Sequence, residues 1–317
     1  MDLVTERYLL DRENAMLTYL INGISLGSVY AIIALGYTMV YGIAKMLNFA
    51  HGDVIMVGGY ASFCTMTYLG WPPALAVLFS MVVCTILGIV VERLAYKPLR
   101  NATSLAVLIT AIGVSYFLQN AALLIWTSNP KVFPDIFASI PPLVIGQVEV
   151  AADGTESGGI VISATTLITI LVNIAIMVGL TLFTNKTKMG KAMRAVSEDK
   201  GAATLMGINV DFTISMTFAI GSGLAAIAGV LLCTAYPNLV PTTGAMPGIK
   251  AFVAAVFGGI GSIPGAMIGG ILLGVIEIIA RAKFPSVPSD IFVFAVLIIV
   301  LLVRPSGLLG KKIREKV

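Results

Sequence analysis

The polar residues that could carry chemistry are few. The densest group lies in the stretch NFAHGDVIMVGGY, residues 48–60, which contains Asn48, His51 and Asp53. A zinc hydrolase needs about three protein ligands, but His51 is the only histidine and the three cysteines are scattered. No GxSxG nucleophile elbow or paired acid–base site accompanies this group. We therefore expect His51 to be either a hydrogen-bonded structural residue at a helix end or a residue that contacts a substrate.

Further polar candidates lie inside apolar segments. Tyr37 and Thr38 fall in the first such segment, and Gln119 and Asn120 fall in a later one. A polar group in lipid is costly unless it has a partner, so these side chains must face a partner, a cavity or the membrane interface. They could line a polar route through the protein, or they could form hydrogen bonds between helices.

The charged residues inside apolar segments suggest local roles. Glu277 and Arg281 are four residues apart, which predicts an ion pair along one helix. Lys250 begins a short apolar piece, and we expect its stem to extend along apolar surface toward the interface. Such charges are too few for a proton relay, and no GxxxxGK[ST] loop is present. If the protein uses energy, the source is expected to be another chain.

Composition places the chain in the membrane. Charged residues make up 11% and hydrophobic residues 58% of the sequence, whereas soluble domains average about 25% charged residues. The net charge of +4 lies mostly in loops, so a nucleic-acid partner is not expected. Cys64, Cys84 and Cys233 all fall in apolar segments, and no disulfide framework is implied.

The apolar segments predict an all-α integral membrane protein with about eight or nine spans. About 20 apolar residues are enough for a helix to cross the hydrocarbon core, and lipid requires every backbone amide to be paired internally. The expected spans form a single transmembrane domain over residues 1–317: 16–43, 51–69, 74–95, 103–126, 160–184, 212–235, a short piece at 249–261, 264–282 and 289–304. The short piece either crosses or is re-entrant, and this choice decides the side of the N-terminus.

The loops indicate an orientation. Basic residues gather in ERLAYKPLR (92–100), in the central segment 185–211 and in the tail after Arg304, and the positive-inside rule assigns these regions to the cytoplasm. If 249–261 crosses, the N-terminus is outside. The segment 127–159 then lies outside as well, where a small β-hairpin around the turn sequence DGTESGG is plausible. This segment is either a connecting loop or a docking surface for an external partner.

Glycine-rich stretches predict two broken helices, one within 42–59 and one within 244–270. In the second, Gly258, Gly259 and Gly261 precede Pro264, and the paired glycines and the missing proline donor favour a break between a short helix and the next span. Broken helices occur in membranes where backbone lines a cavity or is buried in protein.

The central segment 185–211 is the one long interruption in the interior of the chain that carries dense charge. We expect two short helices, the first capped by Thr187 and the second by Ser197, with Glu198 and Asp199 in the first turn of the second helix and an end at Gly207. Leu205 and Met206 are expected on the inner apolar stripe of this pair. The segment is either a cytoplasmic contact for a motor protein or a solvated loop that only orients the chain.

Four stretches together carry a family resemblance. They are residues 23–53, ERLAYKPLR, residues 189–209 and residues 250–274, and LLVRPSGLLG near the C-terminus agrees with them. In order and nearly end to end, the sequence resembles the LivH-type permease of bacterial branched-chain amino acid ABC importers. The outer segment 127–160 matches least, and the Glu-Ala-Ala signature of many other ABC permeases is absent.

The resemblance implies a subunit of a multi-chain importer in the bacterial inner membrane. Its partners would be a second related permease, two cytoplasmic ATPases and an external solute-binding protein. This chain would bind no cofactor, because ATP and magnesium would be held by the ATPases. The implied ATPase-coupling residues are Gly190, Arg194, Ala195, Glu198, Asp199, Ala202 and Gly207. The implied substrate pathway contains Tyr37, Thr38, Asn48, His51, Gln119, Asn120, Gly258, Gly259 and Gly261.

Several alternatives stay open from the sequence. Similar permeases serve importers for urea, short amides and other amino acids, so leucine, isoleucine and valine are only the default substrates. An ion-coupled secondary transporter that acts alone is a second class of function. A membrane enzyme that uses His51 and Asp53 is a third.

Overall fold

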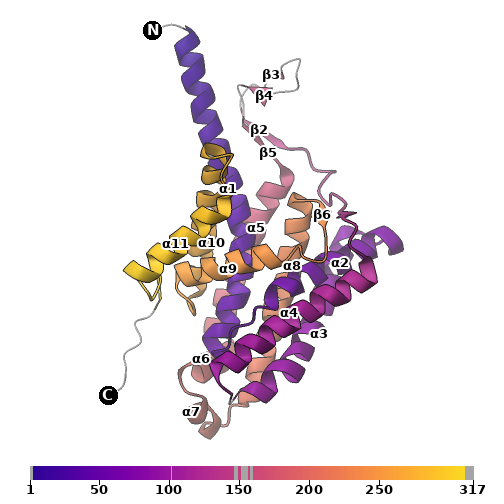
Figure 1. The fold of residues 1–317 in the computed structure, drawn as a ribbon, viewed down its shortest axis with the longest axis vertical. Coiled ribbons are helices and arrows are strands. Elements are labelled where there is room, and N and C mark those ends of the chain that lie inside the picture. Colours follow the sequence, from indigo (N-terminus) through magenta and orange to yellow (C-terminus); the bar gives the residue numbers. More distant parts are fainter. Residues whose placement is uncertain (1–2, 101, 146–148, 151–155, 158–159, 311–317) are drawn as a thin grey trace.

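The long helix α1 (Leu3–Ala44) forms the centre of the molecule (Figure 1). The structure is a computed structural model that describes residues 3–100, 102–145, 149–150, 156–157 and 160–310. Helices from both halves of the chain pack directly on α1: α5 (Ala164–Lys186), α8 (Val210–Ala235), α9 (Ala245–Gly258) and α10 (Ile263–Lys283). Figure 1 places the start of α1 at the end of the molecule opposite α6 and α7. The N-terminal end of α1 and the central polar segment are therefore separated by the length of the bundle.

Within the described residues the fold is almost entirely helical. Ten α-helices follow α1: α2 (His51–Leu69), α3 (Pro73–Val91), α4 (Ser104–Trp126), α5 (Ala164–Lys186), α6 (Lys188–Glu198), α7 (Lys200–Leu205), α8 (Val210–Ala235), α9 (Ala245–Gly258), α10 (Ile263–Lys283) and α11 (Ser289–Val303). Helix α3 continues into a π-helical turn η1 (Glu92–Tyr96) and a 3-10 turn η2 (Lys97–Leu99). The predicted all-α class is confirmed.

The expected number of spans is only partly confirmed. Six helices in the described part of the chain are long and apolar enough to cross a membrane: Ala15–Ala44, Pro73–Leu99, Ser104–Trp126, Ala164–Lys186, Val210–Ala235 and Ile263–Lys283. The other three expected spans are α2, which is not among these six, and the two shorter apolar helices α9 and α11. Polar and small residues fill α2, and 12 of its 19 residues are buried inside the protein.

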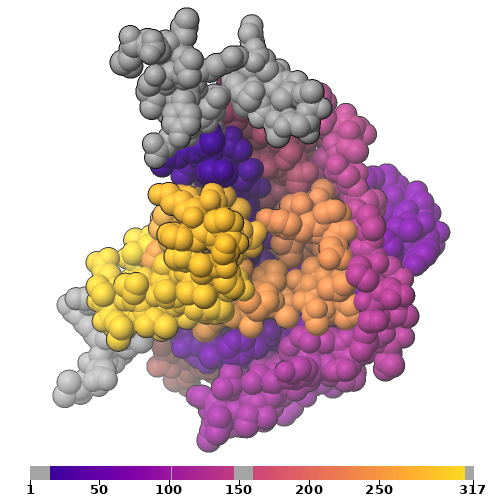
Figure 2. Space-filling view, turned by 45° about the horizontal axis from the view of Figure 1, so that its top comes forward, coloured from indigo at the N-terminus to yellow at the C-terminus, as the bar shows by residue number. Residues whose placement is uncertain are grey.

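Burial separates central spans from peripheral ones. In α1 and α8, 89% and 78% of the most apolar window is buried within the chain, whereas the shares for α4 and α5 are 11% and 22%. Figure 2 shows α4 on the outside of the molecule. The apolar outer faces of α4 and α5 require lipid or a partner chain to cover them.

Small residues allow α1 and α10 to approach closely. A Cβ added at Gly274 would collide with the backbone of Gly27, and one added at Gly270 would collide with Ala31. In lipid, where hydrophobic transfer contributes nothing between helices, such contact gains dispersion energy over the whole interface. At these small residues the packing partner of α10 is therefore α1.

Short antiparallel strands organise the segment after α4. Strand β2 (Leu143–Ile145) pairs with β5 (Ile160–Ile162), and β3 (Glu149–Val150) pairs with β4 (Glu156–Ser157). The predicted hairpin is confirmed, although most of its turn lies outside the described residues. The expected span at 160–184 begins too early, because residues 160–162 belong to β5 and α5 starts at Ala164, capped by Ser163.

One further strand pair joins distant parts of the chain. Strand β1 (Lys131–Val132) follows α4 and pairs with β6 (Asn238–Leu239), which follows α8. Phe133 and Leu239 are fully buried beside this pair. The segment after α4 is therefore fixed to the end of α8 rather than forming only a free connection.

Candidate functional site

The two predicted breaks lie side by side. Helix α1 ends at Ala44 and α2 begins at His51, while α9 ends at Gly258 and α10 begins at Ile263 with Pro264 in its first turn. A Cβ added at Gly42 would lie 3.3 Å from the Cα of Gly261. Non-helical backbone from both halves of the chain is therefore brought to one level of the bundle.

A small recess opens between these breaks. Its volume is about 10 Å³, close to the space that one water molecule needs. Tyr37, Asn48 and Phe252 are among the lining residues, which come from α1, the first break, α9 and the second break. In this conformation the recess holds no free volume for a larger solute, so passage of one requires the surrounding helices to move.

Asn48 is fixed by a hydrogen bond across the bundle. Its side chain is 4% exposed, and its Oδ1 accepts a hydrogen bond of 2.8 Å from the hydroxyl of Tyr96 in η1. Tyr96 is itself buried. The first break is therefore tied to the turn that follows α3.

His51 occupies a tight, buried position at the start of α2. Its ring packs edge-on against Tyr37 with centroids 4.8 Å apart, and a Cβ added at Gly36 would collide with its Nε2. Among the described residues Nε2 has no hydrogen-bond partner although it is buried. Burial of an unpaired polar atom is costly. Both roles considered for His51 remain compatible with this geometry.

The remaining pathway candidates separate into different environments. Gln119 donates a hydrogen bond of 2.9 Å to the buried carboxylate of Asp53, so this amide links α4 to α2. Asn120 instead faces outward and bonds the carbonyl of Tyr116 on its own helix. Thr38 is buried, and its hydroxyl has no partner among the described residues. The structure thus brings Tyr37, Asn48 and His51 together and leaves Asn120 apart.

The three glycines of the second break differ in their surroundings. The backbones of Gly258 and Gly265 are in contact, and Gly259, with φ of 103°, lies against Gly310. Gly261 has φ of 95°, and a Cβ added there would have no described atom within 4 Å. Positive φ values of this kind favour glycine, because other residues are strained there. The break is therefore held mainly by backbone contacts.

The first helix of the polar segment is anchored on the bundle. Thr187 caps α6 through a hydrogen bond of 3.0 Å from the Gly190 amide to its hydroxyl, as predicted. Gly190 packs against the backbone of Thr184, where a side chain would collide. Met193 and Val196 are each 1% exposed. One face of α6 is thus seated against the membrane helices.

The predicted cap of the second helix is wrong. Asp199 caps α7 by accepting a hydrogen bond of 3.0 Å from the Ala202 amide, whereas the Ser197 hydroxyl donates to the carbonyl of Arg194. Glu198 consequently ends α6 and does not begin α7. Both Ser and Asp are strong N-caps, so the sequence offers two caps two residues apart. The helix ends at Leu205, and Gly207 follows with φ of 80°.

The outer surface of the segment 185–211 carries both charged and apolar side chains. Arg194 is exposed and donates to both the side chain and the carbonyl of Asn185. Leu205 and Met206 are 90% and 81% exposed, so their predicted place on an inner stripe is wrong. Ala203 is the buried residue of α7 instead. Of the expected coupling residues, Arg194, Glu198, Asp199, Ala202 and Gly207 are exposed, Ala195 is half-buried and Gly190 is buried.

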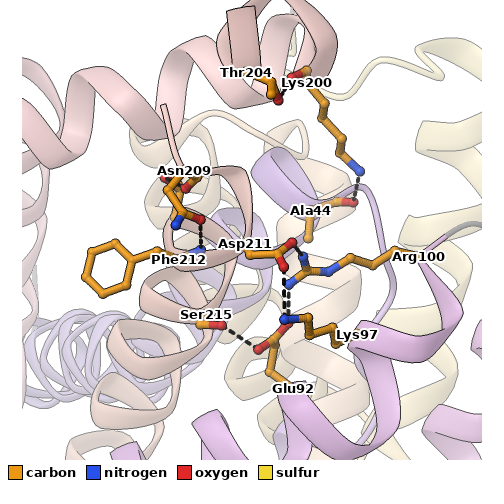
Figure 3. A network of polar contacts seen from close by, with 11 residues as sticks. Ala44, Glu92, Lys97, Arg100, Lys200, Thr204, Asn209, Asp211, Phe212 and Ser215 are labelled. Atoms are coloured by element: carbon orange, nitrogen blue, oxygen red, sulfur yellow. Dashed lines mark hydrogen bonds and ion pairs between the residues drawn. The ribbon is translucent and has the colours of Figure 1, made fainter. Parts of the chain in front are cut away.

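A polar network that sequence reasoning missed lies next to α7 (Figure 3). Glu92 is fully buried, pairs with Arg100 and accepts a hydrogen bond of 2.5 Å from Ser215. Arg100 also pairs with Asp211 near the start of α8, and Lys97 lies 2.9 Å from the same carboxylate. The loop 92–100 therefore lies on the same side as the polar segment, which agrees with the predicted orientation.

A second charge cluster joins α9, α10 and α11. Glu277 is fully buried and pairs with Arg281, as predicted, but it also lies 2.7 Å from Lys250. Lys250 is 5% exposed and reaches Asp290 at 2.6 Å, so the prediction that it extends to the interface is wrong. Tyr30 adds a hydrogen bond of 2.9 Å from α1 to Glu277.

Apolar spans that meet around broken helices, with a polar helix pair at one end, define a multi-pass membrane protein. The comparisons with known proteins agree. The family described as branched-chain amino acid transport system / permease component matches residues 19–301. The chain belongs to this family, and it is a multi-pass protein of the inner membrane.

Individual relatives are similar over almost their whole length. The high-affinity branched-chain amino acid transport system permease protein BraD of Pseudomonas aeruginosa is 45% identical over 309 residues, covering 95% of this chain and 98% of the relative. LivH of Escherichia coli K12 is 44% identical over 309 residues, covering 95% and 97%. A probable branched-chain amino acid permease, LivH of Methanocaldococcus jannaschii, is 29% identical over 89% of both chains. No solved structure matches the chain significantly.

Proposed function

We propose that this chain is the permease subunit of an ATP-driven importer for branched-chain amino acids. The observation that carries the proposal is the similarity, nearly end to end, to BraD and LivH, whose names assign them to high-affinity branched-chain amino acid transport systems. Permeases for urea, short amides or other amino acids remain the alternative substrate class, because a shared fold and family do not fix the solute.

The partners are part of the same proposal. A second related permease covers an apolar face of this chain, an external binding protein delivers the solute, and two cytoplasmic ATPases supply the energy. ATP and magnesium bind the ATPases and not this chain. The largely exposed apolar faces of α4 and α5 support the need for a covering partner or lipid.

The segment α6–α7 is proposed as the contact for an ATPase. It lies at the end of the molecule opposite the start of α1, one face of α6 is seated on the bundle, and Leu205 and Met206 are exposed at the end of α7. Exposed apolar side chains rimmed by charge are typical of protein interaction sites. The residues proposed to carry the contact are Gly190, Arg194, Ala195, Glu198, Asp199, Ala202 and Gly207, with Leu205 and Met206 added.

The solute route is proposed to pass the two adjacent breaks. Tyr37, Asn48 and Phe252 line the recess there, and His51 contributes a buried polar atom that has no partner among the described residues. Because the recess is about 10 Å³ in this conformation, the structure corresponds to a closed state of the proposed route. Rocking of the bundle at the breaks would open it.

Uptake by the reconstituted importer tests the proposal. Proteoliposomes that contain both permeases, the ATPases and the binding protein should accumulate labelled leucine, isoleucine and valine only when ATP is present on the ATPase side. Uptake of urea or acetamide in place of these amino acids would establish the alternative substrate class. Full uptake by this chain alone, driven by an ion gradient and indifferent to ATP, would show a secondary transporter.

Leu205→Asp tests the proposed contact within the same assay. A carboxylate in an apolar contact must be desolvated without a partner, so the variant should lose ATPase binding and ATP-driven uptake by tenfold or more, on the order of the loss at an interface hot spot. Leu124→Asp would be an unsuitable control because that side chain lies on the exposed apolar face of α4, which lipid or a partner chain must cover. Lys188→Asp is better matched, since Lys188 is exposed on α6 and is not among the proposed contact residues.

A further inference from the structure

Beside α7 lies a hollow of about 310 Å³, lined by Lys97, Arg100, Lys200, Val210, Asp211 and Ile214 and here termed the basic hollow. One water molecule needs only about 10–15 Å³. The basic hollow is therefore large enough for a polar ligand. Its cationic side chains come from separate elements, η2 and the following residue on one side and α7 on the other (Figure 3).

Positive charge is in excess around the basic hollow. Three lining side chains are cationic, Lys97, Arg100 and Lys200, and one is anionic, Asp211. The nearby Glu92 is already bonded to both Arg100 and Ser215. Burial, together with the positive charges of Arg100 and Lys45, lowers the pKa of Lys200. The lining thus carries more positive charge than its own carboxylate neutralises.

Donors remain available in this lining. The ammonium of Lys200 bonds the carbonyl of Ala44 at the end of α1, at 3.2 Å, and an ammonium has three donors. The Nε of Arg100 also has no partner among the described residues, although it is buried in this conformation. Lys and Arg donors in this arrangement suit the oxygens of a phosphate group, whose hydrogen bonds are charge-assisted.

The position of the basic hollow relative to the membrane indicates which molecule would supply the phosphate group. Three apolar spans begin or end at it: Ala15–Ala44, Pro73–Leu99 and Val210–Ala235. The ends of apolar spans mark the boundary between hydrocarbon and headgroups. Val210 and Ile214 add an aliphatic wall, which matches the junction of a lipid headgroup with its acyl chains and not a fully hydrated anion.

We propose that the basic hollow binds a phosphate group, supplied by an anionic lipid of the adjoining leaflet. The bound phosphate bridges Lys200 of the polar segment to Lys97 and Arg100 of the turn after α3. Anionic lipid would thereby hold α7 against the loop 92–100 and stabilise the seating of the proposed ATPase contact. The inference does not depend on which solute is transported.

Lipid retention by the purified complex tests this inference. The complex is extracted from nanodiscs of phosphatidylcholine and phosphatidylglycerol in equal parts, and native mass spectrometry measures the ratio of the two lipids retained. Wild type should retain phosphatidylglycerol selectively. Lys200→Gln should lower that selectivity about fivefold, the effect of one basic charge near an anionic surface, and circular dichroism should show that the variant folds.

Two further variants sharpen the result. Arg93→Gln removes an exposed charge from the same loop but not from the lining of the basic hollow, so it should leave the selectivity nearly unchanged. Asp211→Asn removes the carboxylate that competes for Lys97 and Arg100, so it should increase the retention of phosphatidylglycerol. Equal losses in Lys200→Gln and Arg93→Gln would overturn the proposal, because general surface charge would then explain the binding.

A separate arm distinguishes the sources of phosphate. Inorganic phosphate is titrated against chloride at matched ionic strength while the unfolding temperature of the complex is recorded. Stabilisation that is lost in Lys200→Gln, without selective retention of phosphatidylglycerol, would support a phosphate site but assign it to a soluble anion. If neither probe distinguishes wild type from Lys200→Gln, or if the variant releases only the ATPase, the basic hollow is not a phosphate site.

Discussion

The α1–α10 interface and the α6–α7 segment are built in opposite ways. At the interface, glycine backbones touch and leave no room for a side chain at Gly27 or Gly274. In the segment, Leu205 and Met206 extend almost fully exposed. Close packing transmits force because packed elements shift as rigid bodies. Exposed apolar side chains, in contrast, are available to bind a partner chain. Substitutions in the α1–α10 interface should therefore impair folding, whereas substitutions in the α6–α7 segment should impair coupling to the proposed ATPase.

The largest effect is expected from Gly274→Leu. The new side chain would collide with the backbone of Gly27, and separation of α1 from α10 should prevent recovery of a folded permease, as size-exclusion chromatography would show. Gly179→Leu on α5 is the matched control, because a Cβ there has no described atom within 4 Å. Equal recovery of both variants would contradict the close packing of α1 on α10.

A smaller loss is expected from Glu277→Gln. Removing the carboxylate leaves the buried Lys250 without its fully buried partner, and breaking a buried ion pair costs about 3–5 kcal/mol. The free energy of unfolding in detergent measures this loss. Asp290→Asn is the comparison within the same cluster. Its carboxylate is 39% exposed, and a partly exposed pair should cost about 1 kcal/mol or less.

Tyr96→Phe should have an intermediate effect. The variant leaves Oδ1 of Asn48 buried without its donor, at a cost of about 1–3 kcal/mol. If the first break moves during transport, uptake should change together with stability, and both should be measured. Tyr116→Phe removes the same hydroxyl from an exposed position on α4 and should change neither quantity.

The smallest structural effect is expected from the caps of the polar segment. Thr187→Ala removes the acceptor for the Gly190 amide, which should cost about 1 kcal/mol and fray the start of α6. Hydrogen exchange of the amides in residues 188–191 measures the fraying. Ser197→Ala should leave the start of α7 intact, because Asp199 is the cap there. Faster hydrogen exchange in α7 of the Ser197→Ala variant would show that Ser197 is the cap, as the sequence predicts.

Several features of the fold and of the candidate site could be predicted from the sequence. Gly258, Gly259 and Pro264 predicted the second break, because paired glycines loosen a helix and proline removes a backbone donor. The spacing of Glu277 and Arg281 predicted their ion pair. Such inferences succeed because the cause lies within a few residues of its effect.

The predictions that failed depend on features that the local sequence does not determine. Lys250 was misplaced because its partners Glu277 and Asp290 are on other helices, and no local pattern encodes which helices meet. Glu92 was not singled out, although it is fully buried, because its partners are Arg100, just after η2, and Ser215 in α8. Leu205 was assigned to an inner stripe because the boundary between α6 and α7 was misjudged. A shift of two residues turns a helix face by about 200°.

Cross-linking from residue 205 tests the central claim most directly. A photoreactive amino acid is placed there in the assembled importer, and the cross-linked chain is identified by mass spectrometry. If α6–α7 receives force from an ATPase, the account predicts cross-links to an ATPase subunit whose yield changes when ATP is added. Cross-links to the external binding protein, or labelling of this position from outside intact cells, would contradict the account.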